Sequence, residues 1–196
     1  MVLLYAVPKH LDKVVFDLNW GYPSTGRDFL DAVAVTFNGQ KYLQAVDFQT
    51  KQCANGAIQH SGDKMDDVNR RGHHMITVHL KSIPSNITHV FFSLSPWRAS
   101  TICHFKSPSM RFYEESRPDQ MLCTEEISKA GNRQAIVMCS LMKDGDNCLV
   151  HSNGALSNGN LQKFEPLLET MQGCIAKTGN YPYVPVKVYY STCHRP

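Results

Sequence analysis

Short runs of β-favouring residues dominate this chain, and several of them alternate apolar with polar residues, as strands that bury one face in a sheet do. Such runs cover residues 13–18, 32–37, 75–80, 89–94, 110–113, 120–123, 135–142 and 148–150. Asn38-Gly39 predicts a two-residue hairpin turn, because both residues tolerate positive φ, and residues 143–147 predict a second turn. The spacing of the turns is that of a sandwich. We therefore predict a mainly β fold, an antiparallel β-sandwich of two sheets.

A late helix is predicted over residues 161–176. Asn160 is its expected N-cap, whereas Pro166 and Gly173 lower the helix propensity inside the segment. Residues 180–196 return to an extended pattern, in which prolines limit the segment to an edge strand or a surface tail. We divide the chain into a sandwich domain with its closing helix, residues 1–179, and an extended tail, residues 180–196. The apolar residues of the helix recur every three or four positions on one buried stripe: Leu161, Phe164, Leu167, Leu168, Met171 and Ile175.

The composition is that of a folded domain. In 196 residues, 42% are hydrophobic and 19% are charged, which favours one domain with a proper core. Residues 1–7 are too short for the core of a signal peptide, so we expect a cytoplasmic location with the seven cysteines reduced. The formal charge of +3 is too small to indicate a nucleic-acid partner.

Acidic residues cluster in two segments that the strand pattern places near loops. Asp28 and Asp31 lie in the first, and Asp63, Asp66 and Asp67 lie in the second. Two loops that supply carboxylate oxygens from separate strands are what a hard divalent cation needs. The alternative is that these carboxylates cap turns through backbone hydrogen bonds.

Five short motifs then resemble, in their order, the TerD-type domain of tellurium-resistance proteins. Residues 75–84 also resemble the strand-and-proline segment of that family, and the similarity covers about residues 11–176. The resemblance implies a β-sandwich with a helix near the C-terminus, calcium held by acidic loops at one end, a role in the stress response to tellurite, and no defining catalytic activity. The motifs are Leu18-Asn19-Trp20, Leu30-Asp31-Ala32, Asp47-Phe48, Asn55-Gly56 and His60-Ser61-Gly62-Asp63.

Several positions depart from what the resemblance implies. Phe29 stands where the family has an acidic ligand, Lys64 stands where it has asparagine, and residues 68–74 replace a negatively charged run. Arg70 and Arg71 add positive potential, at about 1 kcal/mol for each close approach to a cation. Calcium binding is therefore expected to be weaker than in a typical member, or lost. The candidate calcium ligands are Asp31 and Asp63, then Asp66 and Asp67, and last Asp28 and Asp47.

Two other kinds of site are less favoured by the sequence. Cys53, His60, His73, His74 and His79 suggest zinc, but they lack regular ligand spacing, and we interpret the histidines as scattered surface residues. A cysteine hydrolase would need a cysteine in a recognisable nucleophile turn, which the sequence does not offer. We therefore expect a protein that is not an enzyme.

Five residues are candidates for contacts with partners. Arg70 and Arg71 suit phosphate or an anionic membrane, with a solvated loop as the alternative. Trp97 is either an exposed loop tip or a core anchor. Tyr183 and Tyr189 belong to the apolar tail, which we expect to pack on its own sandwich or on a second copy in a homodimer.

Together these features predict a non-enzymatic stress-response domain that acts as a protein-interaction module, with a working or degenerate calcium site between its loops. The alternative is a metal-free structural or signalling module that is dimeric through its tail. The partner protein stays unidentified, no nucleic acid is expected, and a calcium-dependent membrane contact stays open.

Overall fold

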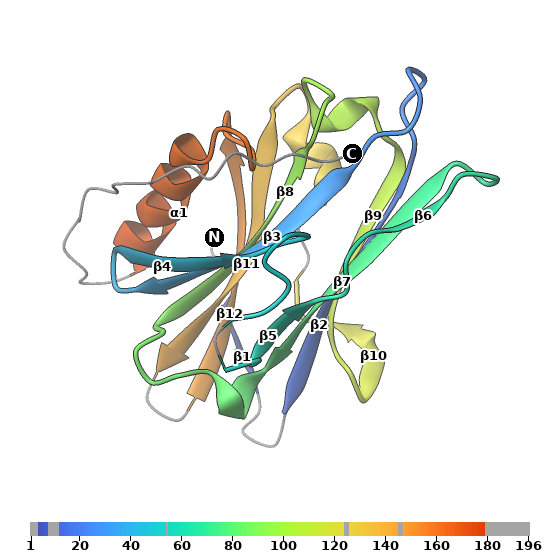
Figure 1. Ribbon diagram of the computed structural model, residues 1–196. Coiled ribbons are helices and arrows are strands. Elements are labelled where there is room, and N and C mark those ends of the chain that lie inside the picture. Colours follow the sequence, from blue (N-terminus) through green and yellow to red (C-terminus); the bar gives the residue numbers. More distant parts are fainter. Residues whose placement is uncertain (1–3, 8–11, 54, 124–125, 145–146, 179–196) are drawn as a thin grey trace.

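The computed structural model describes residues 4–7, 12–53, 55–123, 126–144 and 147–178, and these form two antiparallel sheets (Figure 1). Sheet A contains, in spatial order, β1 (Leu4–Val7), β12 (Asn147–Ser157), β11 (Ala135–Asp144), β8 (His89–Pro96), β3 (Leu30–Asn38) and β4 (Lys41–Val46). Sheet B contains β10 (Arg117–Met121), β9 (Lys106–Glu114), β2 (Lys13–Gly21), β7 (Arg71–His79) and β5 (Ile58–His60), and β6 (Lys64–Asp66) also pairs with β7. The helices are α1 (Glu165–Thr178) and three 3₁₀ turns, η1 (Leu80–Ser82), η2 (Ile102–His104) and η3 (Ile127–Ala130).

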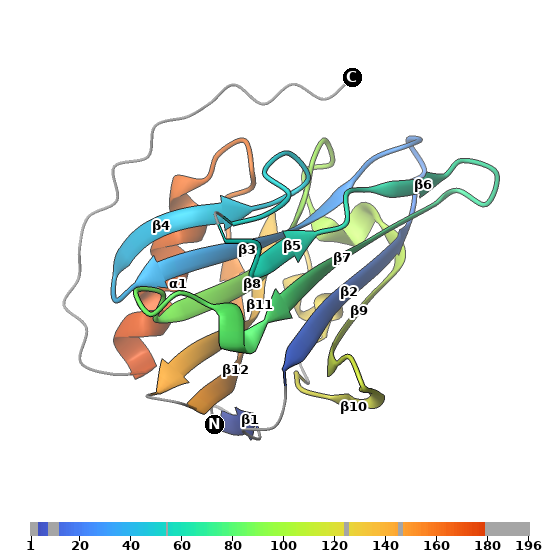
Figure 2. The ribbon, with the colours of Figure 1, turned by 60° about the horizontal axis from the view of Figure 1, so that its bottom comes forward.

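The molecule has three layers, because α1 covers the outer face of sheet A while sheet B covers the inner face (Figures 1 and 2). This arrangement explains why the central strands of sheet A are buried on both faces and are mostly apolar. Every residue of β8 is buried, and in β3 only Asn38 is exposed. A strand that is buried on both faces reads as a continuous apolar run. The predicted two-sheet sandwich with a C-terminal helix is confirmed.

Three phenylalanine rings form the centre of the core between the sheets. Phe16 of β2 stacks on Phe92 of β8 with ring centroids 5.2 Å apart. Phe112 of β9 packs against Phe92 at 5.1 Å. All three side chains are fully buried, which stabilises the fold by about 1.5–3 kcal/mol for each ring. This cluster joins sheet A to sheet B.

The helix starts later than the sequence predicts, for a reason that the sequence contains. Pro166 is the second residue of α1, where its missing N–H has no intrahelical partner to lose. Asn160 caps the preceding turn instead, since its Oδ1 accepts the N–H groups of Gln162 and Lys163. Along the described parts of the chain, no helix combines the length and the apolar character that crossing a membrane requires.

Other boundaries differ from the prediction by a few residues. The first predicted hairpin is present, but Asn38 pairs with Lys41, so its two-residue loop is Gly39-Gln40, with φ of +54° at the glycine. Residues 56–74, where the hydrophobic pattern predicts no strand, contain β5, β6 and the beginning of β7. Strand β1 had no counterpart in the prediction, and the tail of residues 180–196 lies outside the described residues.

Candidate functional site

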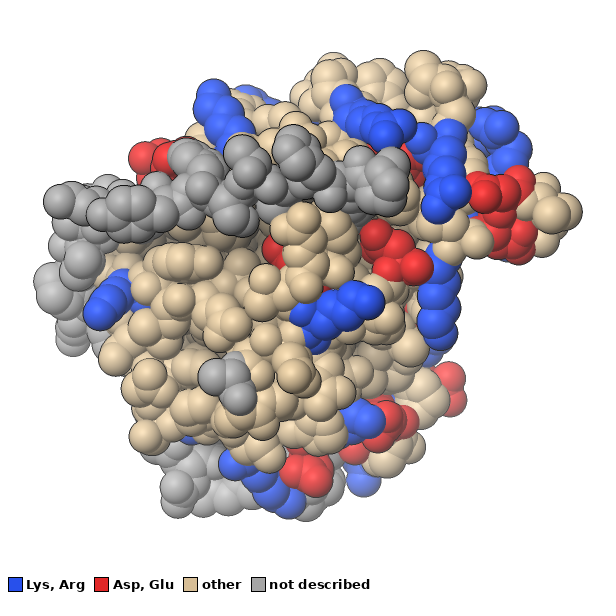
Figure 3. All heavy atoms as spheres, viewed as in Figure 1, with Lys and Arg blue, Asp and Glu red and all other residues tan. Residues whose placement is uncertain are grey.

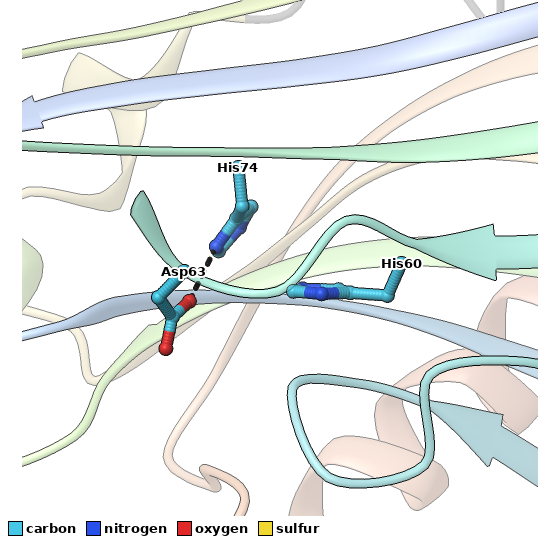
Figure 4. A group of neighbouring side chains, drawn as sticks. All are labelled: His60, Asp63 and His74. Carbon is cyan, nitrogen blue, oxygen red and sulfur yellow. Dashed lines mark hydrogen bonds and ion pairs between the residues drawn. The ribbon is translucent and has the colours of Figure 1, made fainter. Parts of the chain in front are cut away.

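Two histidines and an aspartate meet at one end of the sandwich. His60 ends β5, Asp63 lies between β5 and β6, and His74 lies in β7. Figure 4 shows the three side chains pointing toward one another, and their ligand-type atoms lie within 4.8 Å of each other. Both histidines are buried, and the Asp63 side chain is 12% exposed. Within the described ranges, no other group of three or more His, Cys, Asp or Glu residues is this compact.

Strand periodicity places these residues. Every second residue of β7 from Gly72 to Val78 is buried, and His74 is one of them. His60 of β5 pairs with Ile76 of β7, two residues after His74, and the centroids of the two imidazole rings lie 4.6 Å apart. Gly62 then adopts a φ of +77°, which glycine does without steric cost. The turn brings the following aspartate back over the histidines.

The hydrogen bonds fix where the histidine protons lie. Nε2 of His74 accepts the backbone N–H of Ala32 at 3.1 Å, so the proton of the neutral ring is on Nδ1, which donates to Oδ1 of Asp63 at 2.9 Å. Nδ1 of His60 accepts the N–H of Gly62 at 2.9 Å, which puts the proton of that neutral ring on Nε2. Two neutral imidazoles and one carboxylate therefore make up the group.

We call the contacts of His74 the Ala32–His74–Asp63 bridge. Ala32 belongs to β3 of sheet A, and His74 belongs to β7 of sheet B. Strand β4 pairs with β3 only from Ala34 onward, and the Ala32 amide lies beyond the end of that pairing. The bridge thus ties the two sheets and the β5–β6 connection together at the end of the sandwich where the sheets are otherwise joined by loops.

Two of the six predicted calcium ligands hold loops through the backbone. The carboxylate of Asp28 is buried and accepts the N–H groups of Phe29, Arg98 and Ala99 at 2.8, 3.1 and 2.7 Å. Oδ1 of Asp47 accepts two N–H groups of its own turn, those of residues 49 and 50, at 2.8 and 2.7 Å. Both follow the alternative that the sequence offered, in which carboxylates cap turns.

Two more of the predicted ligands lie on the hairpin that joins β6 to β7. Asp66 is bound by the backbone and side-chain nitrogens of Asn69, and these hydrogen bonds lower the pKa of its carboxyl group. Asp67 accepts the hydroxyl of Tyr22 at 2.8 Å and pairs with Arg27 at 3.2 Å. Burial, together with this hydrogen bond, raises the pKa of Tyr22 to about 12, so its hydroxyl remains a donor.

Asp31 and Asp63 remain as predicted ligands, and the residues present do not fit calcium. Asp31 is 2% exposed on β3 but is not a member of the compact group, whose donors are one carboxylate and two imidazole nitrogens. Calcium takes six to eight oxygen ligands, and its affinity rises with the number of charged carboxylates among them. The sequence predicted that the acidic segments supply ligands to one cation. In the structure, most of their carboxylates instead accept hydrogen bonds or ion pairs from backbone N–H groups and side chains.

The histidines considered for zinc divide between the two faces of sheet B, on β5 and β7. His60 and His74 are buried, so their interpretation as surface residues is wrong. Their burial follows from strand parity, which the sequence displays. His73 faces the other side and pairs with an aspartate of β2 at 2.8 Å. Cys53 and His79 do not belong to the compact group.

The residues predicted to contact partners lie in different environments. Trp97 is only 7% exposed and packs its ring edge-on against Phe48, so it is a core anchor and the exposed loop tip is excluded. Arg70 and Arg71 are exposed and line a groove beside the β6–β7 hairpin. Tyr183 and Tyr189 lie outside the described residues.

This geometry defines a class of domain. It is a β-sandwich that has a helix on the outer face of one sheet and a group of histidines and a carboxylate at one end. The family model of the TerD domain matches residues 2–165, and the chain belongs to that family. The tellurium resistance protein TerZ of Serratia marcescens is 23% identical over 119 residues. That match covers 60% of this chain, and the chain spans 61% of the length of TerZ.

Solved structures show the same fold. A crystal structure of a protein of unknown function has a TM-score of 0.70 and 18% identity, over 83% of this chain and 97% of that chain. The crystal structure of a homologue of the telluride resistance protein TerD, from Streptomyces coelicolor A3(2), has a TM-score of 0.59 and 18% identity, over 74% of this chain and 89% of its own. At this level of identity the likeness establishes the fold alone.

Proposed function

We propose that this chain is a non-enzymatic binding module related to tellurium resistance, which maintains its loop end without calcium. The Ala32–His74–Asp63 bridge is the observation that carries the proposal. It joins the two sheets and the β5–β6 connection through hydrogen bonds, which is the role that a cation between loops would otherwise fill. The family relationship and the name of TerZ support the link to tellurium resistance.

The direction of the His74 hydrogen bonds argues against a cation at Asp63. The Nδ1–H group points its positive end at the carboxylate, at the place where a cation would bind. Moving that proton to Nε2 would set two N–H groups against each other, because Nε2 lies 3.1 Å from the Ala32 amide nitrogen. A cation that replaced this proton at Oδ1 of Asp63 would therefore remove either the His74–Asp63 hydrogen bond or the Ala32–His74 hydrogen bond between the sheets.

The same bridge argues against catalysis. A histidine that is oriented by an aspartate acts as a general base through its far nitrogen. In His74 that nitrogen already accepts a backbone N–H. Two thiols offer no alternative nucleophile, since burial raises the pKa of Cys148 and of Cys174 to about 11, and thiolate is the reactive form.

Thermal unfolding of the full chain in the presence of calcium tests the proposal. Protein freed of metal with a chelator should melt at the same temperature after millimolar calcium is added, and magnesium serves as the control for ionic strength. A ligand at a hundred times its Kd would stabilise the fold by about 2.7 kcal/mol, which a melting curve resolves. A rise in melting temperature that is specific to calcium and absent in Asp63→Asn would overturn the proposal.

The tellurium link needs its own measurement. Removing the gene from its host should lower tolerance to tellurite, and the wild-type chain should restore tolerance. A calcium-insensitive chain that restores tolerance would support both halves of the proposal. Unchanged tolerance to tellurite after removal of the gene would refute the link to tellurium resistance and would leave the conclusion on calcium in place.

A further inference from the structure

A groove of about 850 Å³ lies beside the β6–β7 hairpin and is separate from the histidine and aspartate group. Residues of β2, β6, β7 and the first part of β9 line it, and Trp20 lies in its wall. Small-molecule sites commonly have volumes of about 300–1,000 Å³. The groove is therefore large enough for a molecule the size of a nucleotide or a short polyphosphate.

The charged residues of the groove are mostly cations. Lys64, Arg70, Arg71 and Lys106 face a single carboxylate, Asp66, which leaves an excess of three positive charges. The whole chain has a net charge of +3, so this one groove holds a local excess as large as that of the entire protein. Figure 3 shows lysine and arginine side chains gathered where the hairpin projects.

These cations are not neutralised by ion pairs within the described part of the chain. None of the four has a carboxylate oxygen of a described residue within 4.0 Å. Arg70 is held in place by other contacts, since its guanidinium donates to the carbonyl of Pro23 at 3.1 Å and lies over the ring of Tyr22. The groove thus has one cation with a fixed position and others that are available to a ligand.

The backbone around the groove is strained at two points. Arg70 and Ser107 have φ of +54° and +43°, and among the described residues they are the only non-glycine residues with positive φ. Both line the groove. Such conformations cost free energy and concentrate at ligand sites, because the surrounding structure must hold them. This observation is independent of the charges and points to the same place.

Trp20 gives the groove a rigid wall. Its indole covers Gly72, where a Cβ atom would lie 2.2 Å from the ring, and its Nε1 donates to the carbonyl of Asp28 at 3.1 Å. Trp20 is only 2% exposed, so it fixes the strands that form this wall and offers a ligand little surface of its own. Binding then costs less conformational entropy than it would at a mobile loop.

We propose that this groove binds a small, multiply charged anion of the phosphate type, either an inorganic polyphosphate or a phosphate ester. Several cations around one concave site favour a ligand with several negative charges, and arginine matches phosphate oxygens in a bidentate way. The inference deepens the proposed function, because it names the ligand class of the binding module. It stays distinguishable from that function, since anion binding and insensitivity to calcium are measured separately.

Isothermal titration of the full chain at low ionic strength tests the inference, with inorganic tripolyphosphate and ATP as the two probes. Both should bind, and added salt should weaken both. Tighter binding of tripolyphosphate would identify the inorganic ligand as the source, and tighter binding of ATP would identify the ester. Absence of heat with both probes would overturn the inference, as would binding of an oligonucleotide without binding of either probe.

Variants locate the binding. Lys64→Gln, Arg71→Gln and Lys106→Gln should each weaken binding about fivefold, as expected for one charge near 4 Å in a wet site, whereas Asp66→Asn should strengthen it. Lys41→Gln is the matched control, because Lys41 is exposed on β4 away from the groove. An equal loss in the control and in the groove variants would refute the inference, because the binding would then be non-specific.

Nuclear magnetic resonance supplies a readout that does not need the variants to fold. The chain has two tryptophans, and only Trp20 lines the groove, whereas Trp97 packs against Phe48. Titration with tripolyphosphate should shift the indole N–H signal of Trp20 and leave that of Trp97 unchanged. The reverse pattern, or equal shifts, would place the anion elsewhere and overturn the inference.

Discussion

Replacing His74 by phenylalanine should destabilise the fold by about 4 kcal/mol. The change leaves the buried N–H of Ala32 without its acceptor, which costs about 1–3 kcal/mol, and removes a hydrogen bond to a carboxylate, which contributes about 1.5–3 kcal/mol. His74→Asn should cost less, about 2 kcal/mol, because the amide nitrogen of asparagine can take the place of Nδ1 and still donate to Asp63.

Urea unfolding in the presence of a chelator measures both losses, with the slope m showing whether the compactness of either state has changed. His79→Phe is the matched control on the same strand, since His79 is half-buried and is not a member of the compact group, and we expect it to change stability by less than about 0.5 kcal/mol. A loss below about 1 kcal/mol in His74→Phe would refute the reasoning, because a bridge that joins two sheets cannot be removed so cheaply.

Three further predictions concern other parts of the molecule. Burial lowers the pKa of His89 to about 4 from its usual 6.5. The neutral ring therefore stabilises the fold fully above pH 6.5, and this contribution, at most about 3 kcal/mol, is lost as the pH falls toward 4. His89→Phe should flatten that part of the curve of stability against pH, measured by urea unfolding. Gly72→Ala should destabilise the fold by at least about 2 kcal/mol in the same assay, because the new Cβ would overlap the indole of Trp20. Iodoacetamide should label the exposed Cys103 in the folded chain and the buried Cys174 only after unfolding, as read by peptide mass spectrometry, and equal labelling would contradict the burial.

The hydrophobic pattern predicted the fold well where packing repeats a simple period. Strands β3 and β8 were recognised because burial on both faces leaves most of their positions apolar. The start of β7 was missed, since its inward-facing positions there are Gly72 and His74, which give no apolar period. The late start of α1 could have been read from Pro166, which favours the first turn of a helix.

The site was only partly predictable, and His74 shows why. It lies in phase with Ile76 and Val78, so strand parity alone marks it as an inward-facing residue. The adjacent His73 obscured that signal, because two neighbouring histidines resemble a polar surface segment. The contact with the Ala32 amide is different in kind. It depends on how sheet A packs over sheet B, and no local pattern in the sequence encodes that distance.

At this end of the sandwich, the differences in charge from what the TerD resemblance implies all favour anions over cations. Asp28, Asp66 and Asp67 each accept hydrogen bonds or an ion pair from other residues, which occupy carboxylate oxygens that a cation would need. Arg70 and Arg71 stand in a segment where the TerD resemblance implies negative charge, and both line the groove. A loop end that loses available carboxylates and gains arginines disfavours calcium and attracts anions for the same reason. The two proposals are therefore two consequences of one redistribution of charge, and titrations with calcium and with tripolyphosphate should give opposite results on the same protein.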